Sequence, residues 1–361
     1  MGQRFTICGA ARGAVAVTIA ACAVTATGRA AAVGPDGYKI GPGPWKVASQ
    51  DLVLRDEKRQ KDLEVRVRYP AVAQNAPGRF PLVVFSHGAG GSRDAFPDLT
   101  AHWASHGYIV VLPTHADSIQ LRRRSGEDLS RLQRDLDSLR RDVKPLDRLA
   151  DIVLLLDSIG VMEERIAGLR DRDGNGRVDR DRVGIAGHSA GALTTQMAAG
   201  VKVRGVVPGA LLEARSVGDP RIDAAILISG QGTTNRMFTD RSWSELSKPM
   251  LVITGSKDIA AIGSETPASR REPFEKAKPG DKYLVFINGA THSSYQGRGP
   301  AARLDREQPT DAELEMITSV TSSATLAFLD LYLKDDPAAR AYLGSEALVA
   351  FSGGKAALER K

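Results

Sequence analysis

The chain has 361 residues, of which 42% are hydrophobic and 25% are charged, and its formal net charge is +6. These fractions are typical of folded proteins and exclude a disordered or collagen-like chain. Outside the extreme N-terminus no apolar run reaches the roughly 18 residues of a membrane-spanning helix, which excludes a polytopic membrane protein. The length fits one large domain or two small ones.

Residues 1–32 have the layout of a secretory signal peptide. They contain three arginines, no acidic residue, an apolar segment at 13–24 and a final run of three alanines. Cleavage before Val33 would remove both cysteines and lower the net charge to +3. We therefore expect a secreted or periplasmic protein without disulfides. The alternative is a lipoprotein anchored at Cys22, because residues 19–22 resemble a lipoprotein box.

After this leader we expect an extended arm at 33–49, a catalytic domain at 50–345 and a C-terminal tail at 346–361. Residues 63–69 alternate apolar and polar side chains, which predicts a strand paired in a hairpin with 51–55. Short apolar runs predict buried strands at 82–85, 108–112, 183–186, 224–228, 250–254 and 283–287. Helical patterns lie between them at 97–106, 146–168, 190–199 and 311–333. This alternation predicts an α/β fold with a mostly parallel sheet, whose functional residues follow the strand ends.

A helical insertion is expected at about 118–145. Its apolar positions fit one face of a helix from 125 to 143, capped by Ser125 and Asp128; they are Leu129, Leu132, Leu136, Leu139 and Val143. A helix that packs on the body of the domain is the favoured interpretation, and a lid or lipid-surface contact is the alternative. The arginines at 122–124 are followed by acidic residues, so we expect a salt-bridged surface and no nucleic-acid partner.

Residues 171–179 match the first nine positions of an EF-hand calcium loop. The candidate ligands are Asp171, Asp173, Asn175 and Asp179. The twelfth position should be a bidentate Glu and is Arg182, and a strand rather than a helix is predicted to follow. A polar turn is the favoured interpretation, and a structural calcium site outside the chemistry is the alternative.

A G-x-S-x-G motif, Gly-His-Ser-Ala-Gly at 187–191, lies between a buried run and a helical pattern. In this context a sharp turn holds the serine in a strained conformation, and the two glycines allow close packing of strand and helix. The N-terminus of the following helix directs free N–H groups toward developing negative charge. The motif therefore predicts Ser189 as a nucleophile.

Of the six histidines only His292 follows Ser189, and it lies beyond the run at 283–287. A neutral imidazole there could accept the serine proton and return it to the leaving group. Asp258 follows the run at 250–254 and could orient this histidine. Asp281 and Glu272 are weaker candidates, because neither follows a predicted strand end.

The glycine-rich turn at 86–91 follows an early buried run and predicts one side of an oxyanion hole. The expected donors are the backbone N–H groups of Ala89 and Ala190. His188, Gly88 and Trp243 are candidates to contact substrate. The turn lacks the lysine of a phosphate-binding loop and the spacing of a dinucleotide-binding motif.

Together, the segments 85–91, 104–111 and 187–191 resemble the α/β-hydrolase superfamily. They are most similar to the plasma and intracellular type II platelet-activating-factor acetylhydrolases and their bacterial relatives. The resemblance covers roughly 50–345 and implies a serine carboxylic-ester hydrolase, often acting on short or oxidised acyl chains of lipids. Dienelactone hydrolases have Cys where this chain has Ser189. Polyesterases commonly have Met where this chain has Ala190.

The sequence thus predicts a secreted serine ester hydrolase that works through Ser189, His292 and Asp258 and requires no cofactor. Its expected partner is a small-molecule or lipid ester, with peripheral contact to a lipid surface. A cutinase-like polyesterase or a lipase-like esterase is an alternative. A non-catalytic hydrolase-like binding module is the alternative from another class.

Overall fold

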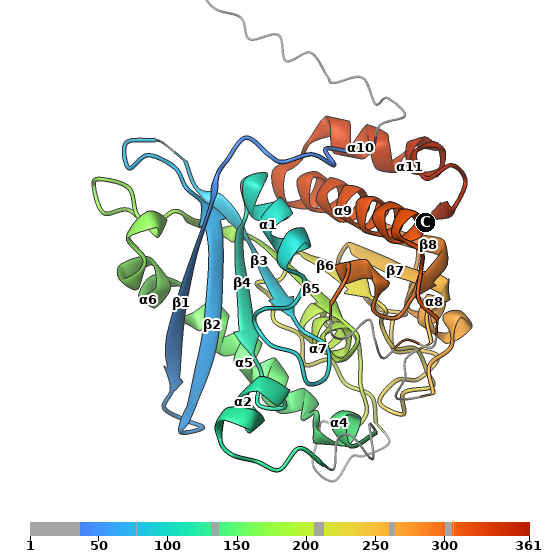
Figure 1. The fold of residues 1–361 in the computed structure, drawn as a ribbon, viewed down its shortest axis with the longest axis horizontal. Coiled ribbons are helices and arrows are strands. Elements are labelled where there is room, and N and C mark those ends of the chain that lie inside the picture. Colours follow the sequence, from blue (N-terminus) through green and yellow to red (C-terminus); the bar gives the residue numbers. More distant parts are fainter. Residues whose placement is uncertain are drawn as a thin grey trace, which may run out of the picture. The chain divides into compact units, whose positions relative to one another are not determined.

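The computed structural model describes residues 37–76, 78–130, 137–205, 213–259, 264–299, 305 and 307–361. Nine strands form one sheet: β1 (Val47–Asp56), β2 (Lys61–Pro70), β3 (Phe80–Ser86), β4 (Ile109–Thr114), β5 (Val178–His188), β6 (Ala224–Ile228), β7 (Met250–Lys257), β8 (Lys282–Thr291) and β9 (Ala356–Arg360). The larger helices are α1 (Pro97–Ser105), α5 (Pro145–Asp157), α6 (Ile159–Arg165), α7 (Ala190–Ala199), α8 (Pro267–Glu275) and α9 (Asp311–Lys334). Shorter helices are α2 (Ile119–Arg124), α4 (Asp137–Asp142), η1 (Ala167–Leu169), η2 (Ser294–Gln296), α10 (Pro337–Leu343) and α11 (Ala347–Phe351). Figure 1 shows the twisted sheet between its helices.

The strand order is β1-β2-β4-β3-β5-β6-β7-β8-β9. The six strands from β4 to β8 pair in parallel, and the pairs at the two edges, β1–β2, β2–β4 and β8–β9, are antiparallel. The predicted hairpin forms as β1 and β2. This mixed, mostly parallel sheet with flanking helices confirms the predicted α/β-hydrolase fold.

Each face of the sheet carries its own core. Side chains alternate along a strand, so Leu82 and Val84 of β3 pack with α5 and α7, whereas Val83 and Phe85 pack with α1 and α9. Both faces are covered, which explains why the central strands are apolar runs without alternation. By length and composition α9 alone among the described helices could span a membrane, but it is mostly buried in this core.

The helical insertion is present, but not as the single helix expected from 125 to 143. Ser125 ends α2 rather than beginning a helix, and Gly126 follows in the left-handed conformation. Asp128 accepts the backbone N–H of Ser130. Residues 131–136, which include two of the expected leucines, lie outside the described residues. Leu139 of α4 is buried against the loop that contains Gly90.

Two other expectations about element boundaries were wrong. The helical pattern at 146–168 is divided at Ser158, which ends α5, and the turn lets Ile159 and Met162 of α6 reach the core. Residues 346–361 are not a tail, because they form α11 and β9 and complete the sheet beside β8. The arm also packs on the domain: Tyr38 is buried and donates to Asp330 of α9.

Candidate active site

The predicted nucleophile lies in a strained turn between β5 and α7. Ser189 has a φ of 55° and a ψ of −118°, a backbone conformation that residues other than glycine rarely adopt. Both glycines of the motif are required by packing. A Cβ on Gly187 would lie 2.3 Å from the carbonyl oxygen of Gly191, and a Cβ on Gly191 would lie 1.9 Å from that of Ser86. The motif therefore folds into a tight turn that carries the serine at the carboxyl end of the sheet.

The structure brings the three predicted triad residues together. Each directly follows the last residue of its strand, Ser189 after β5, Asp258 after β7 and His292 after β8. The Ser189 hydroxyl lies 3.0 Å from Nε2 of His292, and Nδ1 of His292 lies 2.9 Å from Oδ1 of Asp258. With Nδ1 protonated and donating to the carboxylate, Nε2 can accept the serine proton.

Asp258 is fully buried and heavily hydrogen-bonded. Its carboxylate accepts from the hydroxyls of Ser229 at 2.5 Å, Thr254 at 2.9 Å and Tyr295 at 3.2 Å. Nε of Arg270 lies 3.0 Å from Oδ1. Burial alone would raise the pKa of Asp258, but the Arg270 charge and the hydrogen bonds from His292 and Ser229 hold this pKa well below the usual range. The carboxylate is therefore ionised whenever the protein is folded near neutral pH.

The two expected oxyanion donors line the same cavity as Ser189. Ala190 is the first residue of α7, so its N–H has no partner within the helix. The N–H of Ala89 makes no hydrogen bond to a described residue. Gly88 lies close to the nucleophile, because a Cβ there would be 3.6 Å from the Cβ of Ser189. Two free donors and the serine thus face one space.

This cavity has a volume of about 180 Å³. Its walls come from the glycine-rich turn at 86–91 (the oxyanion loop), from the triad strand end with α7, from the insertion, and from the segments after β6 and around the start of α8. The lining residues are Ala89, Arg140, Val143, Pro145, Ser189, Ala190, Leu193, Gln231, Asn235, Met237, Glu265 and Arg270. A larger groove of about 740 Å³, between the arm, α1 and α9, contains no predicted site residue. The position of the nucleophile, and not cavity size, therefore identifies the candidate site.

Two of the expected substrate contacts lie elsewhere. Trp243 is fully buried in the core, where its indole N–H donates to Gln196 at 2.7 Å, and it is absent from the cavity wall. His188 lies behind the triad and donates from Nε2 to the carbonyl oxygen of His292 at 2.8 Å. Burial, with the neighbouring His292, lowers the pKa of His188 to about 3. His188 is therefore neutral near pH 7, and its hydrogen bond supports the backbone at His292.

The residues of the predicted calcium loop do not converge on one point. The Asp171 carboxylate accepts the backbone N–H groups of Asp173 and Asn175, as in an Asx turn. Asp179 already belongs to β5 and lies near Arg182. Within the described part of the chain, no group of three or more His, Cys, Asp or Glu side chains could hold a metal ion. Calcium binding here stays a prediction.

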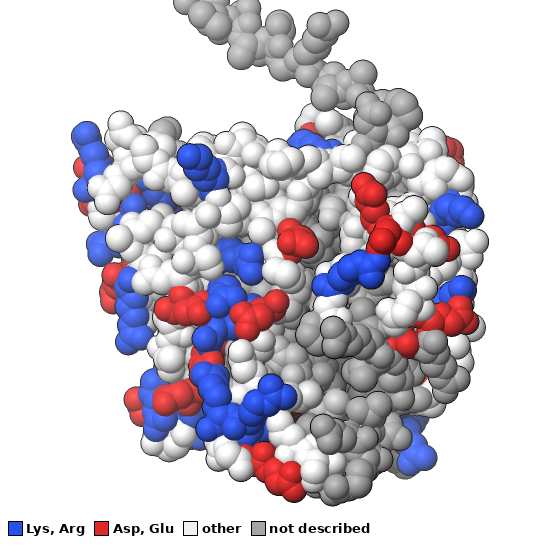
Figure 2. All heavy atoms as spheres, viewed as in Figure 1, with Lys and Arg blue, Asp and Glu red and all other residues white. Residues whose placement is uncertain are grey.

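The basic cluster at 122–124 is balanced by acidic side chains. Arg122 pairs with Glu127 and Asp142, and Arg124 pairs with Glu64. Figure 2 shows positive and negative side chains intermixed on this side of the molecule, next to β1 and β2. The observed pairs agree with a salt-bridged surface.

The sequence did not indicate several polar residues at the site. Arg270 is buried beside Asp258, and the sequence around it is an ordinary charged helix. Gln231 lines the cavity, is more than nine-tenths buried, and its Oε1 has no hydrogen-bond partner among the described residues. Both come from segments that follow strand ends, which was the only available signal. Arg148 donates to the Asp117 carboxylate and to the His87 carbonyl of the oxyanion loop, and neither residue belongs to a recognisable sequence motif.

Comparison with known proteins finds one matching family model and two similar proteins. Residues 67–123 match the family model of platelet-activating factor acetylhydrolase, isoform II. Platelet-activating factor acetylhydrolase of Bos taurus is 26% identical over 142 residues, 32% of this chain and 31% of the relative. Bis(hydroxyethyl) terephthalate hydrolase of Streptomyces coelicolor is 33% identical over 122 residues, 33% of this chain and 30% of the relative. The match to each of these two relatives therefore spans about a third of this chain and about a third of the relative's own length.

The sheet has the α/β-hydrolase fold. Part of the chain is similar to the isoform II platelet-activating factor acetylhydrolases, the family whose resemblance the sequence motifs indicated, and the chain has distant homology to a bacterial bis(hydroxyethyl) terephthalate hydrolase.

Proposed function

We propose that the chain is a serine carboxylic-ester hydrolase that works through an acyl-enzyme. The observation that carries the proposal is the unbroken series of hydrogen-bond distances from Ser189 through His292 to Asp258, at a cavity with two free backbone donors. A hydroxyl is a weak nucleophile, and this arrangement supplies the adjacent base that activates it.

In the first half-reaction the Ser189 oxygen attacks the ester carbonyl while its proton moves to Nε2 of His292. The carbonyl oxygen becomes an oxyanion that accepts the N–H groups of Ala89 and Ala190. Asp258 stabilises the imidazolium and stays ionised. The carbon–oxygen bond to the alcohol then breaks, and the alcohol leaves with the proton from His292. Water repeats these steps on the acyl-enzyme and releases the acid.

Short or oxidised acyl esters of lipids are the favoured substrates. The small cavity at Ser189 supports a short acyl group, and one relative is a platelet-activating factor acetylhydrolase. A second candidate is an ester of an aromatic acid, because the other relative is a bis(hydroxyethyl) terephthalate hydrolase. The pattern of residues 1–32 supports export, with cleavage before Val33 or lipidation of Cys22.

The test is hydrolysis of p-nitrophenyl esters from acetyl to palmitoyl, together with bis(hydroxyethyl) terephthalate, by the protein and by Ser189→Ala. We expect turnover that falls by at least about 1000-fold in the variant, with a maximum at short acyl chains. A long-chain optimum would favour a lipase-like enzyme. Absence of both Ser189-dependent turnover and labelling of Ser189 by a fluorophosphonate would overturn the proposal in favour of a binding module.

A further inference from the structure

A second cleft adjoins the Ser189 cavity. It has a volume of about 880 Å³ and shares Arg140, Asn235 and Met237 with the cavity wall. Two further arginines, Arg204 and Arg236, line it, and none of its described lining residues is acidic. A substrate whose ester bond lies at Ser189 would therefore extend past three guanidinium groups.

These three arginines differ from most others in the protein. Arg66, Arg122 and Arg221 each form ion pairs with two carboxylates. By contrast, Arg140, Arg204 and Arg236 make no ion pair with a described residue, and the buried Nε of Arg204 has no hydrogen-bond partner within the described part of the chain. Like charges in a cleft repel one another and raise the local concentration of anions. The cleft thus retains an uncompensated positive charge.

A separate observation indicates a polar ligand at the junction. Gln231 is more than nine-tenths buried and lines the Ser189 cavity, and no described residue forms a hydrogen bond with its side-chain oxygen. A buried amide without a partner costs free energy unless a ligand supplies one. Its position indicates that the substrate is polar close to the ester bond.

We propose that the substrate is an ester bearing an anionic group, a carboxylate or a phosphate, that binds the three arginines of the cleft. Guanidinium groups bind these anions through paired N–H donors. The inference rests on the proposed ester hydrolysis and adds the charge of the substrate to it.

The test compares two matched pairs of esters. On the acyl side, mono-p-nitrophenyl succinate is compared with p-nitrophenyl butyrate. On the alcohol side, para-acetoxybenzoate is compared with para-acetoxybenzamide. We expect kcat/KM to favour the anion in at least one pair by about tenfold at low salt, and this preference to shrink as salt is added. The pair that responds shows whether the charge belongs to the acid or the alcohol.

In the triple variant Arg140→Gln, Arg204→Gln and Arg236→Gln the preference should disappear, because kcat/KM for each anionic ester falls to that of its neutral partner. The control is Arg55→Gln, Arg165→Gln and Arg172→Gln, which changes the net charge equally but lies outside the cleft; it should keep the preference. Equal rates on both members of both pairs, or a preference that survives in the cleft variant, would overturn the inference. Ser189-dependent turnover of the neutral esters tests the proposed function separately.

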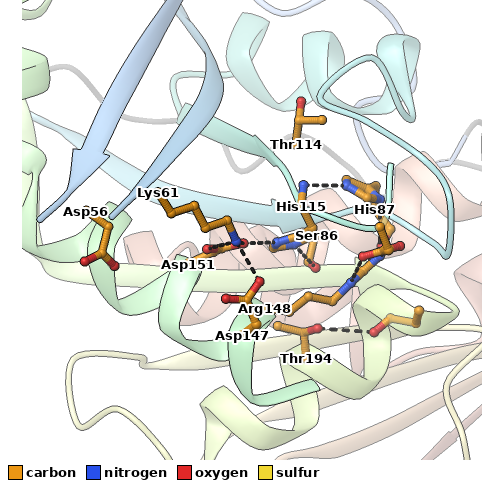
Figure 3. Close-up of polar contacts among 12 residues, drawn as sticks. Asp56, Lys61, Ser86, His87, Thr114, His115, Asp147, Arg148, Asp151 and Thr194 are labelled. Carbon is orange, nitrogen blue, oxygen red and sulfur yellow. Dashed lines mark hydrogen bonds and ion pairs between the residues drawn. The ribbon is translucent and has the colours of Figure 1, made fainter. Parts of the chain in front are cut away.

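A different observation carries a second inference. Beneath the oxyanion loop lies a buried series of side chains with the geometry of the triad (Figure 3). The Ser86 hydroxyl lies 2.9 Å from Nε2 of His115, and Nδ1 of His115 lies 2.8 Å from Asp151. All three are fully buried and none lines a described cavity, so substrate cannot reach Ser86. Lys61 pairs with Asp151 at the outer end.

Arg148 connects this buried layer to the loop itself. Its guanidinium donates to the carbonyl oxygens of His87 at 2.6 Å and Gly88 at 3.1 Å, and it pairs with Asp117 at 2.7 Å. Asp117 in turn accepts the backbone N–H of Gly90 at 3.0 Å. The peptide groups on both sides of the Ala89 N–H are therefore fixed, while that N–H remains free for the oxyanion.

The geometry points to Arg148 as a positioning residue for the oxyanion hole, acting through Asp117 and the two loop carbonyls. Removing it would leave the Ala89 N–H free to turn away from the tetrahedral intermediate. Loss of one oxyanion donor typically lowers kcat by about 100–1000-fold. Because the donor acts mainly in the transition state, KM should change little.

The test measures kcat, KM and inhibition by a trifluoromethyl ketone in Arg148→Gln, Arg148→Lys and a control. The control is Arg177→Gln. Arg177 directly precedes β5, is as buried as Arg148, and donates to the backbone carbonyls of Ala73, Gln74 and Ala76. We expect Arg148→Gln to lose kcat and inhibitor affinity by the same factor, Arg148→Lys to lose less, and the control to lose stability alone. Unchanged kcat in folded Arg148→Gln, or a rise in KM alone, would overturn the inference.

Discussion

Replacement of Arg270 by Met should destabilise the protein strongly, because it leaves the Asp258 carboxylate buried without its counter-charge. The two charged groups are 3.0 Å apart and each is at most 1% exposed. Coulomb's law gives about 5.5 kcal/mol for that distance at an effective dielectric constant of about 20. Removing one partner of a buried pair typically costs about 3–5 kcal/mol. Arg270 also donates to the carbonyls of Ser229 and Gly230, so we expect a loss in the upper part of that range.

The assay is urea unfolding of the single variants Arg270→Met and Asp258→Asn and of the double variant. The double variant should be more stable than the sum of the two losses predicts, by at least about 2 kcal/mol, because neutral Asn no longer needs the arginine. The control is Arg271→Met. Arg271 is the neighbouring residue, its ion pairs are partly exposed, and its loss should cost at most about 1 kcal/mol.

The difference in unfolding free energy between wild type and Arg270→Met should also depend on pH. Arg270 lowers the pKa of Asp258 below its ordinary value of 3.8, so the stability that the pair contributes is fully present above that value. It is lost as the pH falls toward the folded-state pKa, and the difference between wild type and Arg270→Met should narrow below about pH 4. A loss below about 1 kcal/mol at pH 7, or simple additivity in the double variant, would refute the argument.

Three further outcomes are expected. Gly191→Ala would place its Cβ 1.9 Å from the Ser86 carbonyl, so both the melting temperature and ester turnover should fall, and no change in either would contradict the packing argument. Trp243→Phe removes the hydrogen bond to Gln196; it should cost about 1–3 kcal/mol in urea unfolding and leave KM unchanged. His188 has a folded pKa of about 3 against an ordinary 6.5, so wild-type stability falls as the pH drops below 6.5. The unfolding free energy of His188→Asn should fall less steeply over that range, by up to about 1.4 kcal/mol per pH unit.

Local patterns in the sequence predicted the central strands and the strand ends at which the candidate site lies. The apolar runs predicted the central strands, because a strand buried on both faces has few polar positions. The G-x-S-x-G motif and the order of Ser189, Asp258 and His292 predicted which strand ends carry chemistry. Parallel strands bring their carboxyl ends to one edge, so these residues meet although they are up to 103 positions apart.

Only the tertiary structure decided which side chains surround the candidate triad and its oxyanion loop. Arg148 is 31 residues from Asp117, and Arg270 is 12 from Asp258, and no periodicity links such pairs. Residues 356–360 form a strand because β8 offers an unpaired edge, which their own sequence does not reveal. Trp243 packs in the core beside Phe238, where Gln196 accepts its indole N–H. Sequence alone thus predicted the three candidate triad residues from one short motif, the chain order and the strand ends, whereas burial and long-range pairing decided the charges that surround them.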